Sequence, residues 1–390
     1  MSRENVVISL DGHPHAFIDL KPWLPQRFHA GFDEATELGI TTFKGANKYF
    51  ADLAAAGHAF NFESADDLRA VDWRQYNEAM SCEERLAKID ADGVAAELLI
   101  DSFGPITGDP VLNHEITLAF CRWYSDYVSP APYRFAGAVV TAFAAGPEVV
   151  VQEIDAAYRA GLKAVHLPPA PRVARPDLPD YNHPMYEPIW QALNERGMAM
   201  LWHSSVGREK PGWLWSGDAP GWESLLFVDI EEMHKSVLAY LLLSGVPERY
   251  PDLRFGFVES GSTWIAPILE KLDVYMPVAS RNGSYRLGMS PSEQWRRQGF
   301  ASGPLQSEEI AGRHRLGVET LCFGSDFIHT ESSYPNSRRH LESLLSDVPD
   351  RERAAIVRDN AVRLFGFDVD RLAQVPAASH GRALLESGLA

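Results

Sequence analysis

The sequence predicts an α/β fold, a (β/α)8 TIM barrel with long insertions over its C-terminal face. Short apolar runs, expected to be buried strands, alternate along the chain with amphipathic helical stretches. This alternation is typical of βαβ units with parallel strands. The chain has 390 residues, 45% of them hydrophobic, which is enough for one large barrel. Seven or eight such units favour a closed barrel, and no Gly-x-Gly-x-x-Gly or Walker loop indicates a nucleotide-binding fold.

Each expected strand is a short apolar run that ends in polar or small residues. In chain order the strands are Val6–Leu10, Gly93–Ile100, Arg134–Val140, Gly161–Leu167, Met198–His203, Arg254–Glu259 and Thr320–Asp326. The helical stretches between them are Glu83–Ile89, Ile116–Val128, Glu148–Ala160, Pro188–Arg196 and His234–Ser244, with further helices to about Leu364. The strands and helices follow one another in the order that a barrel requires.

Two insertions interrupt the alternation, at about residues 21–77 (Lys21–Asn77) and 208–223 (Arg208–Glu223). Both follow the carboxyl ends of strands, so they are expected over the barrel mouth as a lid or as partner contacts, with plain packing loops as the alternative. The second insertion contains Trp213 and Trp215, an apolar wall for a substrate or a subunit interface. We expect a single domain over residues 1–376 and a loosely attached tail over 377–390.

Composition excludes several classes of partner. The net charge of −17 argues against binding nucleic acid or an anionic membrane, and no apolar stretch is long enough to cross a bilayer. Three separated cysteines (Cys82, Cys121 and Cys322) indicate reduced thiols. Because no basic-then-apolar leader precedes the first strand, we expect a cytoplasmic protein with a small-molecule substrate.

Candidate metal ligands follow several of the expected strands. The first strand runs into Asp11-Gly12-His13-Pro14-His15, in which His13 and His15 are two residues apart and share one side of an extended segment. Three later strands end at His203, Glu259 and Asp326. Since the carboxyl ends of barrel strands converge on one face, we expect all five side chains to share a site. A single His or Asp at a strand end would indicate only a packing residue or a helix cap.

These motifs together resemble the amidohydrolase superfamily, in its branch that includes aminocarboxymuconate-semialdehyde decarboxylase and the dihydroxybenzoate decarboxylases. The likeness runs from about Val6 to about Phe367. Its motifs are Asp11–His15, the strand-end His203, Arg249–Phe255, Glu259-Ser260-Gly261, Phe323–His329, Tyr334–Ser337 and the closing Arg358–Gly366. This combination of motifs identifies the family but does not distinguish between the reactions that its members catalyse.

The resemblance implies that His13, His15, His203 and Asp326 bind a divalent metal. Such a donor set suits zinc, which we expect first, and also manganese or iron(II). In a hydrolase the metal would lower the pKa of a bound water. In a decarboxylase it would anchor the substrate while a proton is delivered to carbon. Asp326, Glu259 and His329 are the expected catalytic residues.

A second metal is the main open question of the sequence. Many family members have a His where Glu259 stands, and a Glu can move protons or bind a second ion. His329 is either a partner in that second ion site or a residue that orients Asp326 by a hydrogen bond. A carboxylated lysine bridge is not expected, because Lys163 begins its strand. His166, near the end of that strand, is expected to be a packing residue, with a ligand role as the alternative.

The leading hypothesis is a metal-dependent hydrolase or non-oxidative decarboxylase that acts on a small carboxylate-bearing substrate. The runner-up is a dinuclear iron or manganese oxygenase subunit on the same barrel, resembling aminoisobutyrate hydroxylase. A catalytically silent paralogue that keeps the barrel and one metal is the third. Relatives often dimerise, so we expect a homodimer or a hetero-oligomer with a related subunit.

Overall fold

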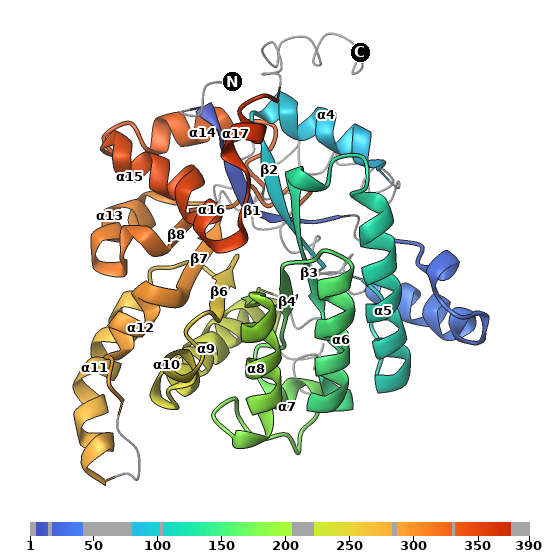
Figure 1. Ribbon diagram of the computed structural model, residues 1–390, viewed down its shortest axis with the longest axis horizontal. Coiled ribbons are helices and arrows are strands. Elements are labelled where there is room, and N and C mark those ends of the chain that lie inside the picture. Colours follow the sequence, from blue (N-terminus) through green and yellow to red (C-terminus); the bar gives the residue numbers. More distant parts are fainter. Residues whose placement is uncertain are drawn as a thin grey trace.

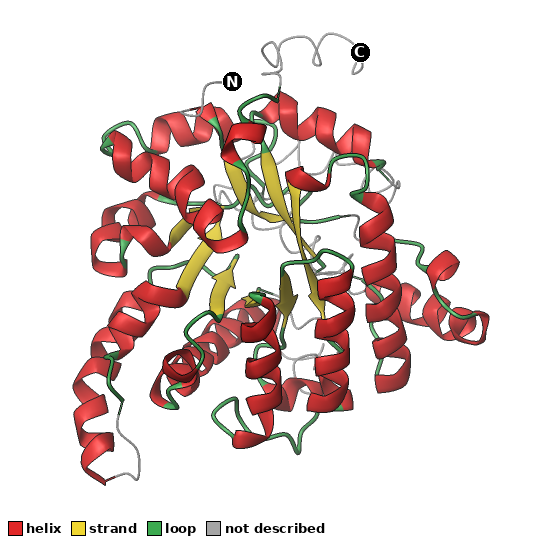
Figure 2. Cartoon of the chain, viewed as in Figure 1, coloured by secondary structure: helices red, strands yellow, loops and turns green. Residues whose placement is uncertain are grey.

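Eight parallel strands form one sheet whose order follows the chain, from β1 to β8. The structure is a computed structural model that describes residues 5–14, 18–41, 80–101, 104–204, 222–282, 287–329 and 332–375. The strands lie at the centre and the helices surround them (Figures 1 and 2). The strands are β1 (Ile8–Gly12), β2 (Ala96–Ile100), β3 (Phe135–Val140), β4 (Ala164–His166), β5 (Ala199–His203), β6 (Arg254–Val258), β7 (Gly299–Gly303) and β8 (Leu321–Phe323). The predicted (β/α)8 barrel is confirmed.

The barrel closes between β1 and the segment that follows β8. Gly12 pairs with Phe327 in a parallel bridge. Two backbone hydrogen bonds flank this bridge: the N–H of His13 donates to the carbonyl of Phe327 at 2.6 Å, and the N–H of Asp326 donates to the carbonyl of Asp11 at 2.8 Å. The closing seam therefore joins the segment that carries His13 to the segment that carries Asp326 and His329.

The helices pack around the outside of the strands and extend beyond several of the predicted stretches. They are α4 (Cys82–Asp92), α5 (Pro110–Tyr127), α6 (Pro147–Arg159), α7 (Pro171–Ala174), α8 (Glu187–Arg196), α9 (Trp222–Leu243), α10 (Val246–Arg249), α11 (Ile265–Asn282), α12 (Pro291–Gln298), α13 (Ser307–Leu316), α14 (Ser337–Leu344), α15 (Asp350–Ala354), α16 (Asn360–Phe365) and α17 (Val369–Leu372). A further helix covers residues 29–41, inside the first predicted insertion. Ser81 and Glu84 form a capping box that starts α4 one residue before the predicted stretch.

Strand β7 is absent from the sequence-based prediction. Its sequence, Gly-Phe-Ala-Ser-Gly, contains no β-branched residue and has glycine at both ends. The glycine at its start is required by packing, because a Cβ at Gly299 would lie 2.3 Å from the Trp295 ring. Tertiary packing thus overrides a weak local strand propensity.

Two hydrophobic clusters lie on the two sides of the sheet. Along each strand, every second side chain points into the barrel, as Ile8, Leu10 and Val258 do. The side chains between them point outward and pack against the helices. At the amino-terminal end of the strands, Phe365 of α16 packs edge-on against Phe300 of β7, with ring centroids 5.7 Å apart. Among the described residues, apolar side chains of α16 cover the start of β7, so this packing stabilises the barrel.

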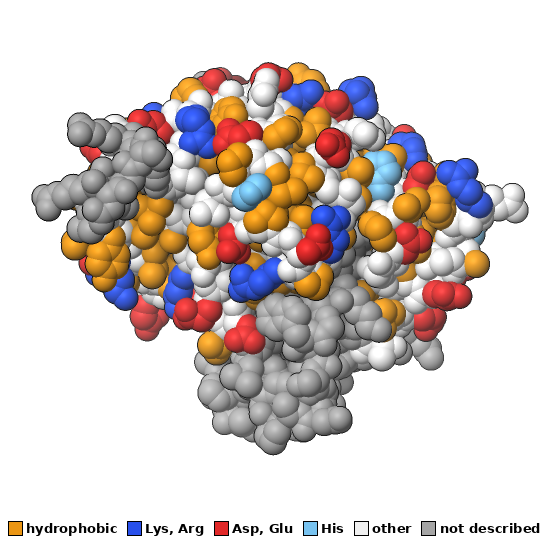
Figure 3. Space-filling view, turned by 90° about the horizontal axis from the view of Figure 1, so that it is seen from below, with side chains coloured by type: hydrophobic (Ala, Val, Ile, Leu, Met, Phe, Trp, Pro, Cys, Tyr) orange, Lys and Arg blue, Asp and Glu red, His pale blue; other side chains and the backbone are white. Residues whose placement is uncertain are grey.

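On the face seen in Figure 3, Lys and Arg side chains are scattered among acidic and hydrophobic ones. No helix in the described ranges combines the length and the apolarity needed to cross a bilayer. The expected tail over 377–390 and nearly all of the second insertion lie outside the described residues, as does the first insertion beyond residue 41.

Candidate metal centre

Strand β1 delivers two side chains to the barrel mouth through a β-bulge. Ser9 pairs with Glu97 and Gly12 with Leu99, so β1 carries one residue more than β2 over this stretch. Because Leu10 faces the interior, regular alternation would turn Asp11 toward the helices. A bulge shifts this alternation and re-aims the side chain, as is common beside active sites. Asp11 and His13 then lie on the same side, and both are buried.

Strands β5 and β6 place His203 and Glu259 side by side. His203 is the last residue of β5, faces the interior like Leu201, and is fully buried. Glu259 follows the interior residue Val258 and adopts a left-handed backbone with φ of 57°. Such a conformation is strained for a residue other than glycine and here breaks the strand alternation. It brings Glu259 Oε2 to 2.9 Å from His203 Nε2, and Ser204 Oγ donates to the same oxygen at 2.6 Å.

The turn after β8 supplies Asp326 and His329. Asp326 also has a left-handed backbone, with φ of 59°, and its carboxylate is fully buried. Its Oδ1 lies 2.6 Å from Nδ1 of His329, a direct ion-pair contact. The His329 ring stacks on the His13 ring with centroids 4.1 Å apart. His329 thus lies where it could either orient Asp326 or offer a ligand atom of its own, the two roles that the sequence left open.

The spacing of these groups fits a shared cation. Nε2 of His13 lies 3.4 Å from Asp11 Oδ1 and 3.2 Å from Asp326 Oδ1, and Nε2 of His203 lies 3.6 Å from Asp11 Oδ1. Two ligand atoms that each sit about 2.1 Å from one ion are roughly 3.0–3.4 Å apart. The other ring nitrogen of His13, Nδ1, lies 3.0 Å from the carbonyl of Ile100, which is the usual way to orient a metal-binding imidazole.

The electrostatics of the centre also call for a cation. Burial, together with the charges of Glu259 and Asp11, raises the pKa of Asp326 well above its usual value. Burial would also raise the pKa of Asp11, but His13 and His203 outweigh it and lower the pKa to about 2. Burial lowers the pKa of His203, yet Glu259 and Asp11 raise it to about 9. Two buried carboxylates, Asp11 and Asp326, and the half-buried Glu259 depend on neighbouring imidazoles for charge balance, which suits a divalent ion.

The structure brings together most of the predicted site residues. Two groups have ligand atoms within 4.8 Å of one another: Asp11, His13 and His203; and His13, Glu259, Asp326 and His329. His15 lies outside the described residues. Asp11 is the residue that sequence reasoning missed, although the rule that residues two apart share a side applies equally to Asp11 and His13. The bulge in β1 cannot be read from the sequence.

His166, Lys163 and His234 lie around the centre at different distances from its ligand groups. His166 ends β4, is buried, and has its ring centroid 5.9 Å from that of His203. Lys163 is exposed and precedes β4, so it cannot bridge two ions. His234 of α9 is buried against Phe257 and Trp264, and burial lowers its pKa to about 3. His234 thus packs against aromatic rings, and the nearby His203 also lowers its pKa.

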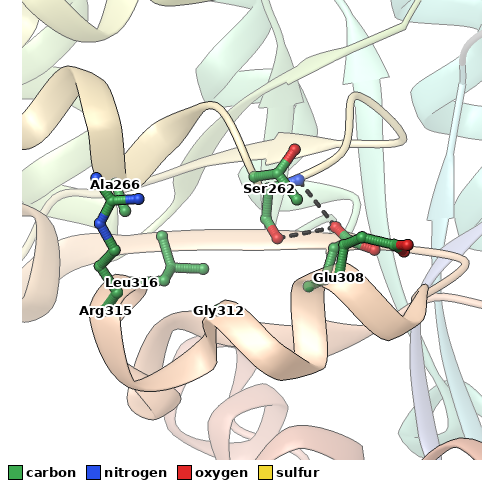
Figure 4. Close-up of a pocket in the computed structure, with 8 residues that line it drawn as sticks. Ser262, Ala266, Glu308, Gly312, Arg315 and Leu316 are labelled. Atoms are coloured by element: carbon green, nitrogen blue, oxygen red, sulfur yellow. Dashed lines mark hydrogen bonds between the residues drawn. The ribbon is translucent and has the colours of Figure 1, made fainter.

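The turn that carries Glu259 is anchored from outside by Glu309 of α13. Glu309 Oε1 accepts from both the N–H and the Oγ of Ser262 at 2.8 Å, and Oε2 accepts from the N–H of Gln306 at 2.9 Å. A cavity of about 140 Å³ lies beside this contact, between Ala266 and the α13 side chains (Figure 4). Glu309 thereby ties the turns after β6 and β7 together.

The amidohydrolase family model matches residues 19–367, so this chain belongs to the amidohydrolase family. Among solved structures, 5-carboxyvanillate decarboxylase from Sphingomonas paucimobilis is 18% identical with a TM-score of 0.65, over 93% of this chain and 99% of that one. The Novosphingobium aromaticivorans enzyme, complexed with manganese and 4-hydroxy-3-methoxy-5-nitrobenzoic acid, is 16% identical with a TM-score of 0.66, over 94% and 97%. For 2,6-dihydroxybenzoate decarboxylase from Rhizobium the values are 15%, 0.60, 76% and 93%. None of the curated protein sequences matches this one.

Proposed function

We propose that this protein is a divalent-metal-dependent decarboxylase that removes CO2 from a small carboxylate-bearing substrate without oxidation. The observation that carries the proposal is the cluster at the barrel mouth, where two groups of ligand atoms share His13 and where Glu259 is the more exposed carboxylate. Named decarboxylases with the same fold support the choice of reaction. Hydrolysis by the same centre is the alternative reaction.

The ligands that we propose are Asp11, His13, His203 and Asp326. A bound ion would supply positive charge that holds and neutralises oxygen atoms of the substrate. Two of these four ligands are carboxylates, which suit manganese, so the donor set favours manganese over the zinc that was expected first. A relative with this fold has manganese bound, which points the same way.

Glu259 is the residue that we propose moves the proton. Its side chain is 16% exposed, whereas the Asp326 and His203 side chains are fully buried. Ser204 holds one of its oxygens and leaves the carboxyl group beside the ligand cluster. In the reaction the C–C bond to the carboxylate breaks, CO2 leaves, and the electron pair left on carbon takes up a proton. His329 keeps Asp326 in place during this step.

The test is a panel of aromatic carboxylates that includes 5-carboxyvanillate and 2,6-dihydroxybenzoate, incubated with the manganese-loaded protein. We expect CO2 release and incorporation of one deuterium into the product in D2O. In E259Q the rate should fall by about 10²–10⁴-fold, the usual contribution of a positioned acid or base, while manganese binding persists. Hydrolysis of amides or lactones without CO2 release from any carboxylate would replace the decarboxylase with a hydrolase.

The number of bound ions separates this proposal from the oxygenase alternative. The two ligand groups share His13, and the 2.6 Å contact between His329 and Asp326 is shorter than the separation of two ligands of one ion. We therefore propose one ion per chain. The decarboxylases named above lend the oxygenase no support. About two iron or manganese ions per chain by elemental analysis would favour it nevertheless.

The quaternary structure stays a prediction. A homodimer or a complex with a related subunit is expected, and light scattering after size-exclusion chromatography would measure its mass. Val274 and Tyr275 of α11 are exposed hydrophobic residues where such a contact could form.

A further inference from the structure

A buried arginine reaches the closing seam of the barrel directly behind the metal centre. Arg85 of α4 is 1% exposed. Its Nη1 donates to the carbonyl of His13 at 2.6 Å, and its Nη2 donates to the carbonyl of Phe327 at 3.4 Å. The Phe327 carbonyl also accepts from the N–H of His13, and Phe327 follows Asp326 in the chain. One guanidinium thus holds the backbone on both sides of the seam.

The charge of Arg85 is balanced by Glu97 of β2. Arg85 Nε donates to Glu97 Oε2 at 2.7 Å, and Glu97 is fully buried. Removing two charges from water costs free energy that a buried pair repays only partly, so apolar side chains would often stabilise a fold as well or better. Stability alone therefore gives a weak reason for this pair, whereas the geometry at the seam gives a strong one.

The residue between the two metal ligands of β1 leaves room for this arrangement. A Cβ at Gly12 would lie 3.1 Å from both Arg85 Nη2 and Glu97 Oε1, and 3.4 Å from the carbonyl of Phe327. The two separations of 3.1 Å are tighter than ordinary van der Waals contact. The glycine of the Asp-Gly-His segment thus lets the Arg85–Glu97 pair lie against the backbone that links Asp11 to His13.

We propose that Arg85, held by Glu97, is a positioning residue for the metal centre. By fixing the backbone at His13 and Phe327, it sets how far His13 Nε2 lies from the Asp326 carboxylate. This inference rests on the proposed metal site. Arginine suits the task because its planar group presents several donors in a fixed fork, while a lysine ammonium is a single point. Contacts of this outer kind tune metal affinity without touching the ion.

The test measures Mn²⁺ affinity, with the six-line EPR signal of free Mn²⁺ as the readout. R85K keeps the charge opposite Glu97 but cannot hold both carbonyls. We expect its dissociation constant for Mn²⁺ to rise by about 10–100-fold, as for loss of other outer contacts. The double variant R85M/E97L removes both charges together, leaves none unpaired, and is expected to show the same loss if the lysine variant does not fold.

A second buried arginine offers a matched control. Arg134 holds the carbonyl of Ala95 near the amino end of β2 and pairs with Asp90 of α4. R134K makes the same substitution far from the site, so its Mn²⁺ affinity should equal that of the parent protein. Affinity of R85K or of R85M/E97L within about threefold of R134K would overturn the positioning role. A parent protein that binds no Mn²⁺ would instead overturn the proposed metal site.

Discussion

The two ends of the barrel are built from the same eight strands and differ in almost every physical property. At the carboxyl end, six ionisable side chains converge, and the backbone departs from regular strand geometry at Asp11, Glu259 and Asp326. At the amino end, regular strands begin among apolar side chains such as Phe300 and Phe365, and the buried Arg134 is paired with Asp90. The contrast teaches that the barrel is stabilised at one end and carries buried charge and strained backbone at the other.

Replacing His13 by alanine should produce the largest effect at the carboxyl end. His13 Nε2 is the atom that the two ligand groups share. We expect H13A to bind Mn²⁺ more than about 100-fold more weakly, beyond the loss typical of outer contacts, and to lose turnover. Elemental analysis of the purified variant measures this directly. Full metal content and activity in H13A would contradict the assignment of the whole centre.

Replacing Phe365 by alanine at the amino end should lower the stability of the fold and leave metal binding unchanged. The side chain packs on Phe300, and its loss would leave a cavity that costs about 3–5 kcal/mol of the free energy of unfolding. We expect F365A to unfold at lower denaturant concentration with unchanged Mn²⁺ affinity in the folded state. A fall in affinity comparable to that of H13A would show that the two ends are not independent.

A smaller effect should come from Asp92, a buried carboxylate next to the turn that enters β2. Burial raises its pKa to about 6, although the N–H of Ser337 donates to Oδ1 at 2.8 Å. The folded state therefore binds a proton that the unfolded chain loses above about pH 4, and stability falls as pH rises from about 4 to 6. D92N keeps the acceptor, and above pH 6 we expect it to be more stable by about 1–3 kcal/mol. Equal stability of the two proteins at pH 8 in urea unfolding would contradict this account.

The smallest effect is expected at Ser204. Its hydroxyl donates to Glu259 Oε2 at 2.6 Å, and hydrogen bonds to charged groups contribute about 1.5–3 kcal/mol. In S204A the catalytic rate should fall by about tenfold, toward the weaker end of that range, while Mn²⁺ affinity and the free energy of unfolding stay near the parent values. A larger effect on metal affinity than on rate would place Ser204 among the metal-ordering residues instead.

Local sequence patterns predicted the strands well where apolar alternation is strong and failed where it is weak. Seven of the eight strands in the sheet correspond to runs recognised from the sequence, and β7 does not. Strand ends were placed less accurately: the run expected to continue to Asp326 leaves the strand after Phe323. The reason is that the left-handed backbone of Asp326 leaves no mark in the local sequence pattern, so the turn cannot be distinguished from a continuing strand.

The candidate site shows the same division. His13, His15, His203, Glu259 and Asp326 were expected to meet because strand ends converge in a barrel. The structure places all of them together except His15, which lies outside the described residues, and brings His329 beside them. Asp11 was missed although it lies two residues before His13; that both side chains face the barrel mouth depends on a bulge, which follows from the pairing of β1 with β2. The contact of Arg85 with the seam depends on where α4 packs, and no local pattern encodes that.

By itself, the sequence determined the parallel barrel, the end of it that carries chemistry, and most of the ionisable residues there. Periodicity and composition act over a few residues, so they settle which segments become strands and what ends them. Only the tertiary structure decided which carboxylates face one another at the barrel mouth, that His329 contacts Asp326, and that a buried guanidinium holds the seam. Those features arise from register, a bulge and left-handed turns, which form only when distant segments pair.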